Sequence, residues 1–175
     1  TGSFLIPVIQ FLLNSKQSTR EQATSVLILA PSKELCSQIG KVLETLTIKC
    51  NKILKWINLA SKSQASAQKF IISQKPDIII STPTRMLNHM KQKNIDLKES
   101  LEMLVMDEAD LLFSYGFEED IKNILSNYMP STYQSILASA TLSSDVIDLK
   151  KIFLHNAVTI KLEEPELPPI NQLSH

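Results

Sequence analysis

The sequence predicts an α/β fold in which a mostly parallel β-sheet is covered by helices on both faces. Short apolar runs of strand length alternate along the chain with longer segments that repeat apolar residues at helical spacing. The clearest runs, SVLILA, DIIIS and LEMLVM, are nearly apolar throughout, as expected for strands that are buried on both faces. Polar or charged residues follow these runs, so the sequence predicts that polar groups gather at one edge of the sheet.

Length and composition fit a single domain. The chain has 175 residues, of which 43% are hydrophobic and 21% are charged, and its 18 basic residues balance its 18 acidic ones. Any contact with nucleic acid must therefore be local. Cys36 and Cys50 form no CxxC or Cys/His cluster, which favours a reduced intracellular compartment and offers no zinc site. No stretch reaches the length of a transmembrane helix, so no membrane contact is expected.

The elements follow from periodicity and composition, taken in chain order. Residues 4–13 are expected to form a helix, whereas residues 14–24 are polar and predict a connector. Pro31 ends the first strand, and the β-branched centre of DIIIS makes it the clearest strand. Strands are expected at 25–30, 53–59, 77–81, 101–106, 135–138 and 158–162, and helices at 4–13, 33–50, 64–73, 85–91, 118–128 and 144–154.

Proline and acidic residues become frequent from residue 163 onward, where the periodicity is lost. We therefore expect one domain over residues 1–162 and the start of an interdomain linker over residues 163–175. A linker in this position implies that a further domain follows it.

The strand LEMLVM stops abruptly at Asp107-Glu108-Ala109-Asp110. Acids at the carboxyl end of a parallel strand suit a Walker B element, in which the first acid holds the magnesium of a bound nucleotide and the second orients the attacking water. Acids are also common in the first turn of an ordinary helix, where the macrodipole is positive. The junction alone leaves both interpretations open.

Three other loops follow predicted strands and are expected at the same edge. Pro31-Ser32-Lys33 and Thr82-Pro83-Thr84-Arg85 combine hydroxyl and cationic groups at a helix start, which suits phosphate binding. Each is also compatible with a plain helix N-cap. The third loop is Ser139-Ala140-Thr141.

In this order, the loops resemble the first RecA-like domain of a DEAD-box RNA helicase. Asp107 to Asp110 match the motif that names the family, and Ser139 to Thr141 match its Ser-Ala-Thr motif. The resemblance extends over essentially the whole chain. It implies an ATP-dependent enzyme that uses Mg²⁺, binds RNA along its backbone and shares both ligands with a second RecA-like domain.

The resemblance also implies roles for individual residues. Asp107 would reach the metal and Glu108 would position the hydrolytic water, which makes these two the catalytic pair. Asp110, Ser139 and Thr141 would couple the nucleotide state to closure on RNA, with Asp110 bonded to one of the two hydroxyls. The candidate RNA-binding residues are Pro31, Ser32, Lys33, Thr82, Pro83 and Arg85, and the candidate ATP-binding residues are Thr1, Gly2, Ser3, Asp107 and Glu108.

The chain departs from the family pattern at several positions. Ser32 and Lys33 replace Thr and Arg, Thr84 replaces a glycine, and no Gly-Gly turn lies within residues 58–65. The family's phosphate loop is also broken, because Ser3 is followed directly by Phe4, with Gly-Lys-Thr missing between them. Either these residues are deleted, or they form a mobile loop that was dropped from the numbering. We favour the second explanation, which predicts a Ser3–Phe4 Cα separation well above 3.80 Å.

The segment LLFSYGFEED resembles the nucleolar branch of the family, which acts in assembly of the large ribosomal subunit. This implies a monomer in the nucleus or nucleolus with pre-ribosomal RNA as its partner. The isolated half is expected to be nearly inactive as an ATPase. A non-catalytic RNA or protein scaffold with a degenerate phosphate loop is the competing hypothesis, and a DNA helicase of similar fold is a third.

Overall fold

The computed structural model describes residues 1–18, 21–61, 65–141, 154 and 157–160. Its centre is one sheet of five strands in the order β2-β3-β1-β4-β5, and every neighbouring pair is parallel. The strands are β1 (Val26–Leu29), β2 (Trp56–Asn58), β3 (Ile78–Ser81), β4 (Met103–Met106) and β5 (Gln134–Leu137). The predicted parallel α/β architecture is therefore confirmed.

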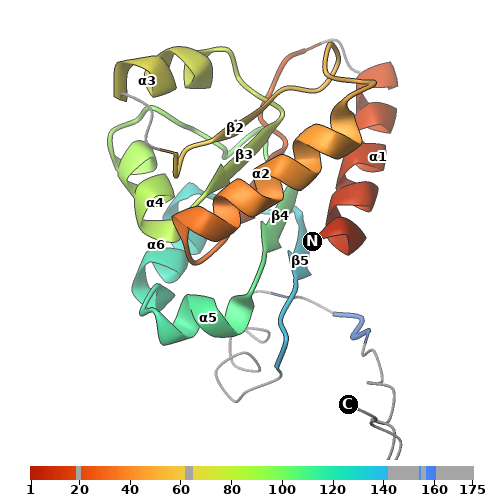
Figure 1. Ribbon diagram of the computed structural model, residues 1–175. Coiled ribbons are helices and arrows are strands. Elements are labelled where there is room, and N and C mark those ends of the chain that lie inside the picture. The colour runs from red at the N-terminus through yellow and green to blue at the C-terminus, as the bar shows by residue number, and fades with distance from the viewer. Residues whose placement is uncertain (19–20, 62–64, 142–153, 155–156, 161–175) are drawn as a thin grey trace, which may run out of the picture.

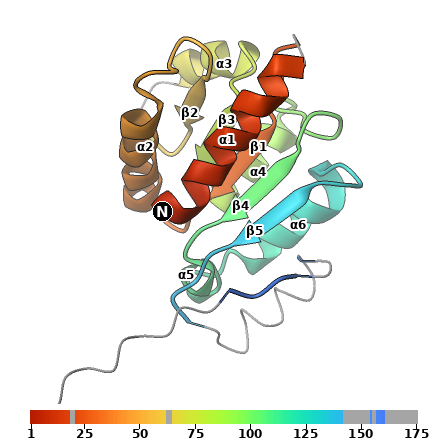
Figure 2. The same ribbon diagram turned by 90° about the vertical axis from the view of Figure 1, so that its right-hand side faces the viewer.

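Helices cover both faces of this sheet (Figures 1 and 2). They are α1 (Gly2–Ser18), α2 (Lys33–Thr47), α3 (Ala65–Ser73), α4 (Pro83–Lys91), α5 (Ala109–Ser114) and α6 (Glu118–Tyr128). On one face, Val26 and Ile28 of β1 pack with the apolar side chains of α1 and α2. On the other face, Leu27 and Leu29 pack with those of α4, α5 and α6. The strands are apolar throughout because successive side chains enter two different cores.

The structure corrects several element boundaries. α1 runs from Gly2 to Ser18, well beyond the predicted residues 4–13, because its last turns are polar and give no apolar period. α5 begins within the acidic junction, at Ala109, and is too short to show a period. The strand expected at 53–59 is reduced to Trp56–Asn58, since residues 47–54 are held in turns by backbone bonds to Thr47 and Cys50.

The two last predicted elements have different outcomes. The helix expected at 144–154 lies outside the described residues except for residue 154. The strand expected at 158–162 is wrong where it can be checked, because residues 157–160 have no regular structure. Val158 and Ile160 are 88% and 86% exposed, so their β-branched side chains contribute to neither core. The proposed linker at 163–175 also lies outside the described residues.

A buried carboxylate joins several segments at the amino-terminal edge of the sheet. Asp77 is 2% exposed and accepts hydrogen bonds from the Gln22 side chain at 2.9 Å and the Lys55 backbone N–H at 2.7 Å. The ammonium group of Lys16, at the end of α1, lies 2.8 Å from the same carboxylate. This cluster fastens α1 to the sheet at the edge opposite the acidic junction.

Candidate functional site

The four loops singled out in the sequence meet at the carboxyl edge of the sheet. Backbone hydrogen bonds continue the strand pairing into them: Ala30 N–H donates to Ser81 O at 3.1 Å, and Asp107 N–H donates to Leu29 O at 3.0 Å. Ala109 N–H donates to Ala138 O at 3.0 Å. Because all five strands are parallel, their carboxyl ends form one edge, and the loops lie side by side on it.

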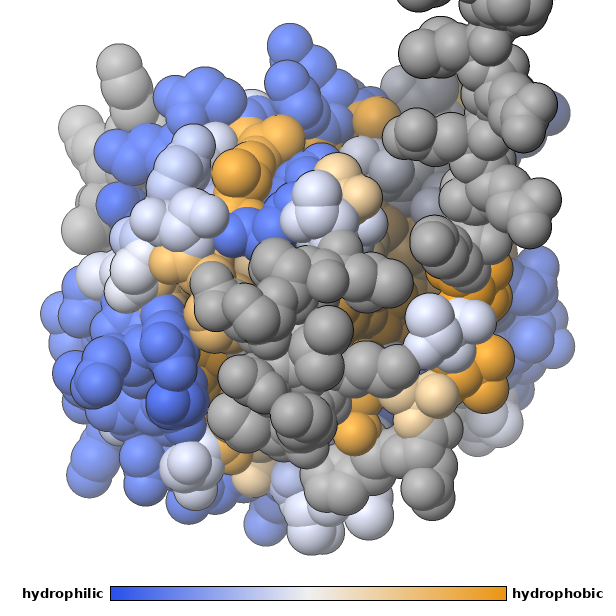
Figure 3. Space-filling model, turned by 90° about the horizontal axis from the view of Figure 1, so that it is seen from below, coloured by the Kyte–Doolittle hydropathy of each residue, from blue (hydrophilic) through white to orange (hydrophobic). Residues whose placement is uncertain are grey.

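Figure 3 looks onto this side of the molecule from below Figure 1. Hydrophilic residues cover one flank of the view, and patches of hydrophobic surface reach the solvent between the polar groups. Where the described residues are visible, this side of the molecule therefore presents both polar and apolar surface.

Asp107 and Glu108 form the acidic centre of this edge. Asp107 is only 7% exposed, and its Oδ1 accepts from the Glu108 backbone N–H at 3.1 Å. Glu108 has a left-handed backbone with φ 51° and ψ 54°, an uncommon conformation for a residue with a side chain. Such strain is characteristic of residues that a functional site holds in a fixed orientation.

Burial raises the pKa values of both carboxyls, and like charge adds to the rise at Glu108 alone. Desolvation is the main cause at Asp107, where the chain's amino terminus and the Glu108 N–H act in the opposite direction. Desolvation also raises the pKa of Glu108, with further contributions from Asp107 and Asp110. Two crowded carboxyls of this kind favour the approach of a cation.

Asp110 links this acidic centre to the loop after β5. Its Oδ2 accepts a hydrogen bond from the Thr141 hydroxyl at 2.9 Å, while the Ser139 hydroxyl donates to Thr141 O at 2.7 Å. The predicted contact between Asp110 and one of the two hydroxyl residues is thus confirmed for Thr141. The coupling role of the three residues stays a prediction.

The start of α1 lies close to the acidic centre, since the amino terminus acts on the pKa values of Asp107 and Glu108. Thr1, Gly2 and Ser3 are therefore at the predicted edge. The favoured explanation for the broken phosphate loop is wrong, however. Ser3 and Phe4 are consecutive residues of one helix, and Leu5 N–H donates to Thr1 O at 3.2 Å across the junction. The chain as it stands lacks Gly-Lys-Thr at this point.

The loop before α2 is built as a helix cap. Ser32 is the N-cap, and its hydroxyl accepts from Leu35 N–H at 3.1 Å. Pro31 is buried, whereas Lys33 is exposed at the first turn of α2. Lys33 therefore provides the exposed cationic group of this loop, and the Ser32 hydroxyl already accepts a hydrogen bond within it.

The loop before α4 is arranged differently. Thr82 is the N-cap but makes no side-chain cap bond, and Pro83 occupies the first turn. The Thr84 hydroxyl donates to the carboxylate of Asp120 in α6. The Arg85 guanidinium donates from Nη2 to the side-chain oxygen of Gln68 at 2.9 Å.

Sequence reasoning missed Gln68. It is fully buried, although glutamine is among the residues that usually stay exposed. One available signal is its position four residues before the buried Ile72, which places both side chains on the same face of α3. A polar residue at a core-facing position is worth noting in any helix.

The acidic centre fits a magnesium ion that is shared with a nucleotide. Among the described residues, no group of three or more His, Cys, Asp or Glu side chains could hold a metal by itself. Mg²⁺ keeps several waters and is usually bound through one or two carboxylates together with substrate phosphates. Asp107, buried beside Glu108, is suited to be that carboxylate.

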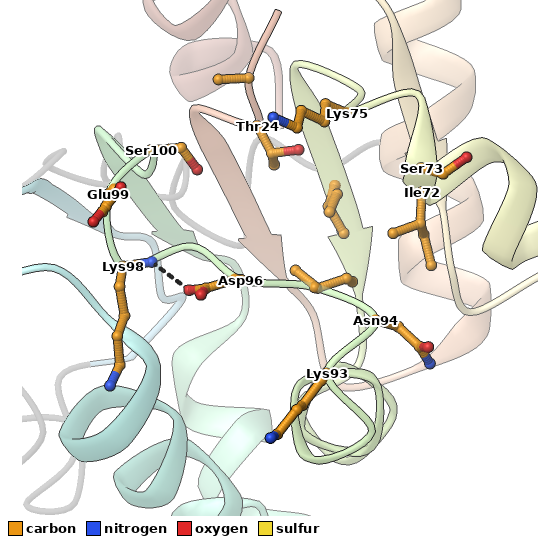
Figure 4. A pocket seen from close by; sticks show the side chains of 13 residues that line it. Thr24, Ile72, Ser73, Lys75, Lys93, Asn94, Asp96, Lys98, Glu99 and Ser100 are labelled. Atoms are coloured by element: carbon orange, nitrogen blue, oxygen red, sulfur yellow. Dashed lines mark hydrogen bonds between the residues drawn. The ribbon is translucent and has the colours of Figure 1, made fainter.

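A hollow of about 500 Å³ lies at the opposite edge of the sheet, lined by residues that include Thr24, Ile72 and Lys98. Figure 4 shows that the ammonium groups of Lys75, Lys93 and Lys98 do not converge in it. Within the described part of the chain, no helix has the length and apolar character needed to cross a membrane.

Comparison with known proteins agrees with this geometry. The family model described as "DEAD/DEAH box helicase" matches residues 1–149. The chain is 37% identical over 94% of its length to a probable ATP-dependent RNA helicase ddx56 of Dictyostelium discoideum. It is 40% identical over 95% of its length to the ATP-dependent RNA helicase dbp9 of Aspergillus niger.

The solved structure of the yeast DEAD-box splicing factor Prp28 matches 87% of the chain with a TM-score of 0.76 and 26% identity. The match spans only 24% of the Dictyostelium protein, 27% of the Aspergillus protein and 37% of the Prp28 chain. Because this family model matches most of its length, the chain belongs to the DEAD/DEAH box helicase family.

Proposed function

We propose that this chain acts as the first RecA-like domain of an ATP-dependent RNA helicase. The observation that carries the proposal is the acidic centre of Asp107 and Glu108, joined through Asp110 to Thr141 at the edge where the strands end. Relatives named ATP-dependent RNA helicases, which match almost the whole chain, support it. A second RecA-like domain would complete both the nucleotide site and the RNA site.

In the proposed reaction, water attacks the γ-phosphate of ATP in line with the leaving diphosphate. Magnesium, when bound with the nucleotide, neutralises charge on the phosphates, and Asp107 is the residue that would hold it. Glu108 would orient the attacking water and accept its proton. A carboxylate with a raised pKa suits that task, because it is a stronger base than an ordinary glutamate.

RNA would lie across the loops before α2 and α4. Lys33 and Arg85 supply cationic groups for phosphates, and the start of α4 adds backbone N–H groups with the hydroxyl of Thr82. Pro31, Ser32 and Pro83 would shape the two loops and present their backbone to the RNA. Such contacts follow the backbone of the RNA and its shape, not its base sequence.

We further propose that the helicase is a monomer that acts on pre-ribosomal RNA in the nucleolus. The proposal rests on the LLFSYGFEED segment, whose first seven residues lie in α5 and the turn before α6 and whose last three begin α6. Affinity purification of the tagged protein tests it: precursors of the large ribosomal subunit should co-purify. Recovery of other RNAs alone would contradict the assignment while leaving the helicase function intact.

Substitution of Glu108 by glutamine is expected to reduce RNA-stimulated ATP hydrolysis by the full-length protein at least about a hundredfold, by removing the general base. Glutamine has nearly the same size, so ATP and RNA binding should persist. Phosphate release under saturating ATP and RNA measures the effect. The control is Glu44→Gln, an exposed change on α2, which should leave the rate unaltered. Equal rates for Glu108→Gln and wild type would refute the role of Glu108.

A non-catalytic RNA or protein scaffold remains the second candidate, and one observation favours it. The helix α1 runs without interruption through Ser3 and Phe4, so the lysine that grips phosphates in the family has no counterpart there. Absence of any RNA-stimulated hydrolysis in the wild-type, full-length protein would support the scaffold. Hydrolysis that depends on Glu108 would exclude it.

Asp120 places a negative charge beside the proposed RNA path through its bond with Thr84. Asp120→Asn keeps a hydrogen-bond acceptor for Thr84 and removes the charge, so RNA affinity is expected to rise about two- to fivefold at low salt, with a smaller effect at high salt. Fluorescence anisotropy with a labelled single-stranded RNA measures it. Glu99→Gln makes the same charge change at the opposite edge and should alter affinity less. Equal effects of the two variants would show that only net charge matters.

A further inference from the structure

A buried amide connects two loops at the carboxyl edge of the sheet. Gln68 of α3 is fully buried, and its side-chain nitrogen donates to the backbone carbonyls of Leu59 at 3.1 Å and Ser61 at 3.4 Å. Both carbonyls belong to the segment that follows β2. The amide nitrogen of Gln68 therefore fixes the path of the chain immediately after that strand.

The other end of the same amide holds Arg85. The side-chain oxygen of Gln68 accepts from Arg85 Nη2 at 2.9 Å, across the space between α3 and the start of α4. One amide group thus joins the segment after β2 to the loop after β3. Donor and acceptor are both engaged, so the amide can take only one orientation without losing a hydrogen bond.

Arg85 keeps an unused donor next to this contact. Its Nε is buried and has no hydrogen-bond partner among the described residues. A buried N–H group is nearly always paired in folded proteins, so the unpaired Nε marks an unusual environment for Arg85. The residue as a whole is only partly buried, and its guanidinium group has five N–H donors, so donors other than Nε remain to bind a phosphate.

The neutrality of Gln68 matters for this arrangement. A carboxylate at the same position would also accept from Arg85, but it would cancel the positive charge that attracts a phosphate. An amide fixes the guanidinium and leaves its charge available. Among the described residues, Arg85 forms no ion pair, and the nearby Asp120 bonds instead to Thr84.

We propose that Gln68 is a positioning residue that orients Arg85 toward an RNA phosphate and ties that contact to the segment after β2. The inference rests on the proposed function, because it assigns a phosphate of bound RNA to the remaining donors of Arg85. It predicts that Gln68 acts on RNA binding only through Arg85. The two residues should then behave as one unit in a double-mutant cycle.

Gln68→Met keeps the length of the side chain and removes the donor and the acceptor. In the 175-residue chain, this change is expected to weaken binding of a labelled oligouridylate about five- to tenfold. The slope of log affinity against log salt should become less steep by about 0.7, the value for one lost phosphate contact on a single strand. Arg85→Met should give the same change in slope, and Gln68→Met should add nothing in the Arg85→Met background.

Two further variants separate positioning from a general loss of structure. Gln68→Glu keeps an acceptor for Arg85 but removes the donor to the carbonyls of Leu59 and Ser61, so circular dichroism first checks that the variant is folded. In the folded variant, RNA affinity should fall through loss of net charge. Ser73→Ala changes an exposed residue at the end of α3 whose hydroxyl bonds only locally, to Phe70 O, and should leave affinity and slope unaltered.

The outcomes distinguish the inference from the proposed function. If the wild-type chain binds no RNA, or if Arg85→Met has no effect, the proposed RNA site is overturned and the inference falls with it. If binding depends on Arg85 but the Gln68 variants match the wild type, only the inference is overturned. Additive losses in the double variant would also overturn it, because they would show that Gln68 acts independently of Arg85.

Discussion

Replacing Asp77 by alanine is expected to lower the free energy of unfolding by about 3–5 kcal/mol, the usual result of removing one partner from a buried ion pair. The carboxylate is almost inaccessible to water and serves Lys16, Gln22 and the Lys55 N–H together. Its loss leaves these donors without their acceptor at the point where α1 meets the sheet. Urea denaturation followed by circular dichroism measures the change.

The matched control is Glu118→Ala, which breaks the other ion pair of the described residues. The Lys122 ammonium lies 2.6 Å from the Glu118 carboxylate, closer than the Lys16–Asp77 pair at 2.8 Å. Both side chains of this pair are 50% exposed, so water and salt weaken the attraction. For Glu118→Ala, no measurable shift of the urea denaturation midpoint is expected. A similar shift for both variants would contradict the assignment of Asp77 as the more important residue.

Insertion of Gly-Lys-Thr and two small residues between Ser3 and Phe4 is expected to raise ATP affinity at least about tenfold. The inserted lysine would supply charge-assisted hydrogen bonds to the phosphates, which contribute about 1.5–3 kcal/mol each. The start of α1 lies near Asp107, so the rebuilt loop would face the residue proposed to hold magnesium. Equilibrium binding of a fluorescent ATP analogue, with added magnesium, measures the gain.

A second insertion in which alanine replaces the new lysine controls for the change in helix length. It should bind ATP no better than the original chain. If both insertions bind equally well, the lysine is not the missing contact and the nucleotide is held by other groups. If neither insertion variant binds ATP, the proposed nucleotide site at this edge is contradicted. The proposed RNA binding by the loops before α2 and α4 does not depend on this result.

Most of the fold followed from apolar periodicity. The strand centres at β1, β3 and β4 were predictable because a run that is apolar on both faces is stable only between two helix layers. The parallel arrangement then placed the four loops at one edge without knowledge of the strand order. Prediction failed where polarity hides the pattern, as in the last turns of α1, and where an element is too short, as in α5.

The sequence also determined the family, because short motifs in a fixed order depend on residue identity alone. Contacts between residues far apart in the sequence could be predicted only in part or not at all. The pairing of Asp110 with Thr141 was anticipated only as a choice between two hydroxyls. The bond between Gln68 and Arg85 could not be anticipated, since it depends on how α3 packs beside β3 and α4.

The broken phosphate loop illustrates the same division. The sequence determined that Gly-Lys-Thr is missing and that a parallel α/β domain would carry Asp107 and Glu108 at its ligand-binding edge. Only the tertiary structure decided that Ser3 and Phe4 continue one helix, that Glu108 adopts a left-handed backbone and that Arg85 keeps a buried, unpaired donor. The physical reason is that motifs and periodicity are local, whereas burial, backbone strain and hydrogen-bond partners are set by segments far apart in the chain.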